Sequence, residues 1–112
     1  MSNLELRRPA SNPAAIFAAL GDPTRLSLLM KLSGGSGQSI ARLSADNRLT
    51  RQAVTKHLHV LEKAGLVSSL RVGRESRFVY APEPVAEARS YLDAVSAQWD
   101  DALERLQTFV EH

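Results

Sequence analysis

The sequence contains no cysteine. Disulfides, thiolate zinc sites and cysteine nucleophiles are therefore excluded together. No window approaches the roughly 20 apolar residues that a membrane-spanning helix needs. The N-terminal stretch MSNLELRRPASNP also lacks an apolar run of signal-peptide length. We therefore expect a cytoplasmic protein without a membrane partner, and a chain of 112 residues is typical of one domain.

The signatures of catalysis are also missing. The chain has neither a glycine-rich phosphate loop nor a nucleophile elbow. His57 and His59 are the two internal histidines, and on a helix they would point about 200° apart. They cannot ligate one ion. The C-terminal segment offers several carboxylates, but its one histidine is the terminal His112, which makes a poor transition-metal site. We therefore predict no metal site, no cofactor and no enzymatic activity.

Charge is divided unevenly along the chain. The net charge is only +2, but residues 22–81 hold ten basic and four acidic residues, whereas residues 82–112 hold two basic and seven acidic ones. Such a division indicates a middle segment that meets a polyanion and a tail with another task. A solvated surface without a partner explains the same counts, and composition alone does not decide between the two.

Capping signals divide residues 12–65 into four helices. Asn12 and Gly21 bound the first, and Asp22 followed by a proline starts the second, which ends at two glycines. A short third helix is expected over 39–45 with a turn at 46–47, and Thr50 starts a fourth that runs to residue 64. The apolar faces are expected to comprise Leu26, Leu29, Met30 and Leu32 in the second helix, and Ala53, Val54, Leu58 and Leu61 in the fourth.

The hydrophobic period then changes from helical to alternating. Residues 66–72 and 75–81 flank a glycine and an arginine, which predicts a two-stranded hairpin with a basic tip. One long helix follows after two prolines. Its apolar stripe comprises Val85, Ala88, Leu92, Val95, Trp99, Leu103, Leu106 and Val110.

A short helix, a tight turn, a second helix and a basic hairpin make a winged helix-turn-helix. We therefore predict a mainly α fold with a β-hairpin, made of an N-terminal segment (1–12) expected to be poorly ordered, a DNA-binding core (13–81) and a C-terminal helix (82–112) in one domain. A helix of this kind fits the major groove of double-stranded DNA, and its first turns reach base edges.

The polar face of the fourth helix supplies the candidate DNA-binding residues, which are Thr50, Arg51, Gln52, Thr55, Lys56, His59 and Lys63. Gln52 suits adenine, Arg51 and Lys56 suit guanine or phosphate, and a threonine hydroxyl can donate to a phosphate or its methyl touch thymine. Arg71, Arg74 and Arg77 at the hairpin suit phosphate or minor-groove contact. His57 lies at the margin of the apolar face, where a half-buried histidine is expected.

Two other interpretations remain at this point. Arginines on a hairpin edge also discourage strand-to-strand aggregation. A winged helix can serve protein–protein contact without binding DNA, although such a module needs neither the basic middle segment nor the exposed Arg/Gln/Thr/Lys face.

Three motifs together resemble the ArsR-type winged helix-turn-helix repressors. They are ALGDPTRLSLLMKL (19–32), LTRQAVTKHLHVLEKAGLV (49–67) and RVGRESRFVY (71–80), in this order and at these spacings. The resemblance covers about residues 13 to 110. Many members sense metals through cysteines or through Asp/His/Glu sets on the last helix. This chain has no cysteine, and the only histidine of its last helix is the terminal His112. It is therefore most similar to a cysteine-free branch of the family that does not sense metals.

The resemblance implies a homodimeric bacterial repressor bound to a short palindromic operator. It also implies that the first and last helices form the dimer interface, and a long apolar stripe that one small domain cannot cover agrees with this. Packing of the stripe within a single chain is the alternative. The expected interface residues are Ile16, Phe17, Leu20, Leu92, Val95, Trp99, Leu103, Leu106 and Val110. The sequence identifies neither the operator sequence nor a small-molecule effector.

Overall fold

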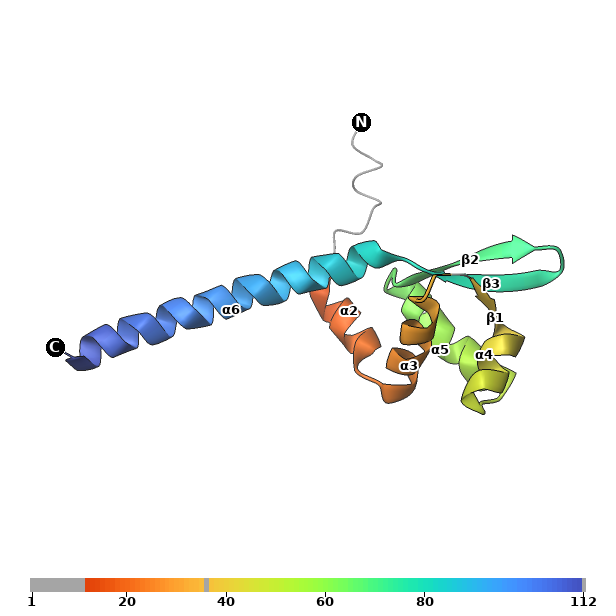
Figure 1. The fold of residues 1–112 in the computed structure, drawn as a ribbon, viewed down its shortest axis with the longest axis horizontal. Helices are drawn as coiled ribbons and strands as arrows, with labels where there is room; N and C mark the ends of the chain where they lie inside the picture. The colour runs from red at the N-terminus through yellow and green to blue at the C-terminus, as the bar shows by residue number, and fades with distance from the viewer. Residues whose placement is uncertain (1–11, 36, 112) are drawn as a thin grey trace, which may run out of the picture.

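The computed structural model describes residues 12–35 and 37–111. The predicted N-terminal segment thus lies outside the described residues, except for Asn12. The described elements are α2 (Pro13–Leu20), α3 (Pro23–Leu32), β1 (Gln38–Ser39), α4 (Ile40–Asn47), α5 (Arg51–Lys63), β2 (Val67–Val72), β3 (Glu75–Tyr80) and α6 (Pro82–Glu111). Helices α2–α5 and the sheet form a compact head, from which α6 projects to one side and the β2–β3 hairpin to the other (Figure 1).

Local capping sets the start of the predicted helices. The side chains of Asn12, Asp22 and Thr50 each accept a hydrogen bond from the backbone N–H three residues further on, at 3.3, 2.9 and 3.0 Å respectively. Each bond satisfies one of the donors that a helix leaves unpaired at its first turn. Gly65, just after α5, has a φ of +80°, the left-handed conformation expected beyond a helix end.

The helix-turn-helix turn falls two residues later than predicted. Helix α4 continues through Asn47, and the left-handed residue is Arg48, with a φ of 55°. The amide of Asn47 donates to the Leu43 carbonyl at 2.7 Å, so this side chain supports the last helical turn instead of breaking it. Asparagine bonds to nearby backbone in either conformation, which is why residue type alone misplaced the turn.

The predicted hairpin is part of a three-stranded antiparallel sheet in the order β1-β3-β2. Strands β2 and β3 pair from Val67↔Tyr80 to Val72↔Glu75, which leaves a two-residue loop whose Gly73 has a φ of +63°. The two-residue strand β1 pairs with β3 and was not predicted, because two residues carry no detectable period. Gly37 before it allows the close approach: an added Cβ would lie 3.2 Å from the Val79 side chain.

One apolar core joins the helices of the head to the sheet. Leu28, Leu32, Leu43, Leu58 and Leu61 are fully or almost fully buried. The predicted faces of α3 and α5 were partly wrong. The corrected α3 face comprises Leu28, Leu29 and Leu32, whereas Leu26 is 45% and Met30 73% exposed; Ala53 of α5 is only half-buried. The stripes 26/29/30 and 28/29/32 both satisfy helical spacing, so periodicity alone could not choose between them.

Among the described residues, the contacts of helix α6 with the head lie at its first turns. Ala88 is 5% exposed, and the rings of Phe17 in α2 and Tyr91 in α6 lie 6.0 Å apart at 54°. From Leu92 onward the large apolar side chains of the helix are mostly exposed. The C-terminal two-thirds of α6 therefore extends away from the other described elements (Figure 1).

Substitution of one buried and one exposed residue of α5 tests this packing. Leu58 is 0% and Val60 41% exposed. We expect Leu58→Ala to lower the free energy of unfolding by about 2–5 kcal/mol, because it leaves a cavity. Val60→Ala should change it by about 0.5 kcal/mol or less. Urea unfolding at one fixed protein concentration measures both, and equal losses would contradict the assigned rotation of α5.

Candidate nucleic-acid interface

The core fixes which face of α5 meets solvent. Val54, Leu58 and Leu61 are each 0% exposed and lie along the inner side of the helix. The outer side presents the predicted residues Arg51, Gln52, Lys56, His59 and Lys63, all of them exposed. These side chains therefore lie together on one accessible face, with the polar and basic character that double-stranded DNA requires.

Two threonines of the predicted set have structural tasks. Thr50 is exposed, but its hydroxyl accepts the capping bond from Ala53. The hydroxyl of the half-buried Thr55 donates to the Arg51 carbonyl at 2.7 Å. Its hydrogen is thus used within the helix, and the predicted donation from Thr55 to a phosphate is not available in this conformation. What Thr55 offers a ligand is a methyl group and an acceptor.

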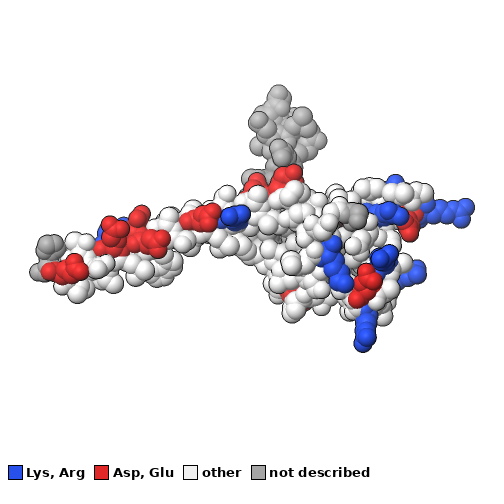
Figure 2. Space-filling model, viewed as in Figure 1, with Lys and Arg blue, Asp and Glu red and all other residues white. Residues whose placement is uncertain are grey.

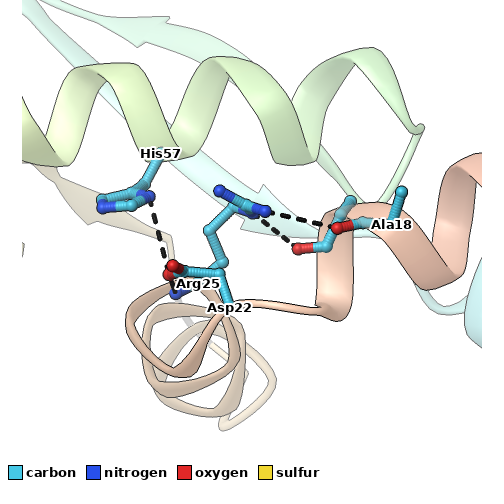
Figure 3. Close-up of polar contacts among 5 residues, drawn as sticks. Ala18, Asp22, Arg25 and His57 are labelled. Carbon is cyan, nitrogen blue, oxygen red and sulfur yellow. Dashed lines mark hydrogen bonds and ion pairs between the residues drawn. The ribbon is translucent and has the colours of Figure 1, made fainter.

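The two histidines of α5 differ as predicted. His59 is exposed beside Lys63, whereas the side chain of His57 is 25% exposed and its Nδ1 lies 3.9 Å from Oδ2 of Asp22 (Figure 3). Asp22 is the cap of α3. His57 therefore connects helix α5 to the start of α3, and it does not share a ligand with His59.

The contacts of Asp22 and Arg25 explain the Asp-Pro-Thr-Arg motif at residues 22–25. Arg25 donates from Nε to the Ala19 carbonyl at 2.6 Å and from Nη2 to the Ala18 carbonyl at 3.2 Å, while its backbone N–H donates to Asp22 (Figure 3). The guanidinium thus satisfies carbonyls at the C-terminus of α2, where a cation is favourable. Arg25 counts toward the basic middle segment of the sequence, but its charge is committed to the fold.

The arginines of the hairpin are exposed, but they are not equivalent. Arg74 lies in the two-residue loop and Arg71 on β2. Arg77 on β3 forms an ion pair with Glu75, with Nε and Oε1 3.0 Å apart. The carboxylate partly neutralises the charge of Arg77. Arg71 and Arg74 therefore contribute more to the positive potential of the β2–β3 hairpin, which is the wing of the fold.

A shallow hollow lies where the wing meets the helix-turn-helix. It is lined by Gly37, Gln38, Ser39, Ala41, Arg42, Glu75 and Arg77. Arg42 was absent from the predicted site, although it belongs to the basic middle segment and to the first turn of α4. It forms an exposed i,i+4 pair with Asp46 at 3.5 Å, and the folding of β1 onto β3 brings it beside Arg77.

Basic and acidic side chains separate along the molecule. Figure 2 shows lysines and arginines on the wing and on the adjoining helical part of the head, and mainly aspartates and glutamates along α6. The division of charge in the sequence is therefore also a division in space. The surface that suits a polyanion is the end of the head opposite the projecting part of α6.

Two other classes of site find no support in the described residues. Within ranges 12–35 and 37–111, no group of three or more His, Asp or Glu side chains is placed to hold a metal ion. The described part of the chain likewise contains no helix with the length and apolarity that a bilayer crossing requires.

The fold and this surface define a winged helix-turn-helix protein. Residues 20–69 match a family model described as a helix-turn-helix domain. The chain is 42% identical over 80 residues to the HTH-type transcriptional regulator YuzN of Bacillus subtilis, covering 66% of this chain and 87% of that one. It is 37% identical over 91 residues to the HTH-type transcriptional regulator CmtR of Mycobacterium tuberculosis, covering 79% and 72%.

Solved structures agree with this classification. An ArsR-like transcriptional regulator from Rhodococcus sp. RHA1 superimposes with a TM-score of 0.78 at 36% identity, covering 87% of this chain and 91% of that one. The homodimeric winged helix-turn-helix domain of an ArsR-family candidate from Mycobacterium bovis shares the fold, with a TM-score of 0.61 at 22% identity over 76% and 78% of the two chains. The chain belongs to the ArsR-type winged helix-turn-helix transcriptional regulators. It is thus a DNA-binding regulator and not an enzyme.

The surroundings of the Asp22 carboxyl make the free energy of unfolding depend on pH. The hydrogen bond from the Arg25 backbone N–H is the main cause that holds the pKa of the Asp22 carboxyl below its ordinary value of 3.8, and the charges of Arg25 and of protonated His57 act in the same direction. A carboxyl whose pKa is lower in the folded state stabilises the fold above its unfolded pKa. This contribution is lost as the pH falls through the folded pKa.

We therefore expect the stability of the wild type to fall as the pH drops below about 4. Asp22→Asn keeps a capping side chain but has no charge to lose, so its stability should fall less over the same window. Urea midpoints at a series of pH values measure this difference, with Asp101→Asn on the exposed side of α6 as a control. Curves of Asp22→Asn and wild type that stay parallel would contradict the assignment.

Proposed function

We propose that this regulator is a cytoplasmic repressor that binds a palindromic operator as a homodimer. The observation that carries the proposal is the exposed face of α5, which presents Arg51, Gln52 and Lys56. Lysines and arginines also cover the wing and the adjoining helical part of the head (Figure 2). A two-fold dimer presents two such faces, and two identical half-sites in opposite orientation are the sequence that it reads. A dimer bound across a promoter blocks transcription by occupying it.

The residues on this surface divide between base edges and the DNA backbone. The amide of Gln52 pairs with adenine in the major groove, and Arg51 and Lys56 reach guanine or phosphate. His59 and Lys63, further along α5, meet phosphates. The N-terminus of α5, capped by Thr50, also directs backbone N–H groups toward a phosphate, and the methyl group of Thr55 faces a thymine.

The wing supplies the contacts that do not depend on sequence. Arg71 and Arg74 meet phosphates or the minor groove, and Arg77 does so when DNA displaces Glu75 from it. Arg42, at the hollow beside Arg77, joins this group. All four side chains are exposed, so no rearrangement of the core is needed before they reach DNA.

The apolar surface of α6 supplies the dimer contact. Leu92, Trp99, Leu103, Leu106 and Val110 are between 53% and 73% exposed. Val95 and, from α2, Phe17 and Leu20 are half-buried and complete the surface. Ile16 no longer belongs to the set, because it is 2% exposed and already covered by its own chain.

Salt dependence tests the DNA contact. The affinity of the purified protein for a duplex should fall steeply between low and physiological salt, because each neutralised phosphate releases counterions. A protein–protein interaction module would not shift a duplex even at low salt. Binding that is absent at low salt, or that is indifferent to salt, would refute the assignment of the basic surface.

Two alanine variants separate base contact from phosphate contact. Gln52→Ala should cost about 1–3 kcal/mol on the operator and much less on an unrelated duplex. Arg74→Ala should weaken both duplexes alike and reduce the salt slope by about one. Arg89→Ala on α6 removes the same charge away from the proposed surface and serves as the control, with binding unchanged. The opposite pattern for Gln52 and Arg74 would refute these roles.

A further inference from the structure

Of the residues that the structure describes, one that is not glycine has a positive φ. It is Arg48, between α4 and α5, with a φ of 55° and a ψ of 41°. In this left-handed conformation the Cβ atom lies too close to the following carbonyl oxygen, which costs free energy for every residue except glycine. Glycine is accordingly the usual residue just beyond the end of a helix. Arg48 thus occupies a position at which the backbone disfavours a side chain.

The contacts that close this turn do not involve the side chain of Arg48. Its backbone N–H donates to the Ala45 carbonyl at 3.4 Å, and the backbone N–H of Leu49 donates to the Ser44 carbonyl at 3.1 Å. The Ser44 hydroxyl donates to the Leu49 carbonyl. A glycine at position 48 would keep all of these hydrogen bonds, so they do not explain why an arginine is there.

The charge of Arg48 is also unused within the described part of its own chain. The guanidinium groups of Arg25, Arg42 and Arg77 each contact a carbonyl or a carboxylate. Among residues 12–35 and 37–111, the ion pairs do not include Arg48, whose side chain is exposed. Backbone strain of this kind is concentrated at functional sites. An uncommitted cation on a strained backbone therefore points to a ligand outside the chain.

Arg48 lies directly before the N-terminus of α5. It precedes the cap Thr50 by two positions and the first helical residue, Arg51, by three. Two residues of extended chain span at most about 7 Å, and an arginine side chain has a comparable reach. Its guanidinium can therefore contact the same phosphate as the free backbone N–H groups at the start of α5, or the neighbouring phosphate.

The wing lies beyond the other end of the same helix. Helix α5 has 13 residues and is therefore about 20 Å long, and β2 begins shortly after its end. In Figure 1 the hairpin lies above the turn between α4 and α5, and both lie on the side of the head away from the projecting part of α6. The major groove is about 12 Å wide, so a helix of this length placed across it has a phosphate backbone near each end.

We propose that Arg48 binds a DNA phosphate at the N-terminal end of α5, on the side of the major groove opposite the backbone that the wing contacts. The inference rests on the proposed function and adds a contact to it. A helix held at both ends tilts less in the groove, so Gln52 keeps a fixed distance from the base edge that it reads. Arg48 is thus a positioning residue, because a phosphate contact fixes orientation but carries no sequence information.

A use of Arg48 within the fold is the alternative. A cation at the C-terminus of a helix is favourable, and Arg48 directly follows the last residue of α4. The two uses predict different results when glycine replaces the arginine. Stability falls if the cation serves α4, whereas it is kept or increased if the cation serves DNA, because glycine relieves the strain of the backbone.

The full-length variants Arg48→Gly and Arg48→Lys test the proposal beside the wild type. The urea midpoint of Arg48→Gly should equal or exceed that of the wild type. Its affinity for one fixed duplex of mixed sequence at about 0.1 M salt should fall at least about fivefold, and the slope of log affinity against log salt should decrease by about one for each bound chain. Arg48→Lys keeps the charge and should keep the slope and most of the affinity.

Two further variants serve as controls. Arg89→Ala removes the same charge from α6 and should leave affinity and slope unchanged. Arg48→Asn removes the charge with a residue that also tolerates the left-handed conformation and is less flexible than glycine, so it should lose as much affinity as Arg48→Gly. A loss confined to Arg48→Gly would come from the flexibility of the turn and would overturn the phosphate contact.

The outcomes separate this contact from the proposed function. Arg48→Gly that binds the duplex with wild-type affinity, or more weakly but with an unchanged salt slope, would overturn the contact and leave DNA binding intact. A lower urea midpoint for Arg48→Gly would assign the arginine to the end of α4 and overturn the proposal as well. A wild-type protein that binds no duplex even at low salt would refute the proposed function itself.

Discussion

The burial of one side of α5 is the constraint on which the remaining structure depends. Val54, Leu58 and Leu61 are completely enclosed, and they set the rotation of the helix. With that rotation fixed, the polar side chains between them can only face outward. The core and the nucleic-acid surface are therefore two sides of one helix, and a change that loosens the core also misdirects the surface.

A small polar corner holds α5 in place relative to the helices before it. Asp22 caps α3 through the Arg25 backbone, and the Arg25 side chain caps the end of α2. His57 of α5 lies against the same carboxylate. Three helices thus meet around Asp22 and Arg25, and the lowered pKa of the Asp22 carboxyl makes the stability of the head depend on pH. None of these groups needs DNA to perform this task.

The sequence predicted those features that are decided by nearby residues. The caps at Asp22 and Thr50 and the glycine turn of the wing depend on contacts within a few positions, and all were found. Strand β1 depends on pairing with residues about 40 positions away, and no local signal announces it. The role of Arg25 depends on which carbonyls its long side chain reaches. The rotation of α3 was ambiguous because two apolar stripes share the same spacing.

In the candidate site too, the features set by nearby residues were predicted and those set by particular side-chain contacts were not. Residue types and spacing identified the exposed residues of α5 and the wing, because burial of one face determines the other. The internal bond of Thr55 and the pairing of Arg77 with Glu75 could not be read from spacing. Arg42 was overlooked because its proximity to the wing comes from β1, the element that the sequence did not reveal.

Selection of duplexes from a random pool by the full-length protein at physiological salt tests the central claim most directly. The account predicts enriched sequences that are inverted repeats, with half-sites about one helical turn apart or a multiple of it, each duplex bound by two chains. A pool without enrichment, or an unrepeated site bound by a single chain, would contradict it.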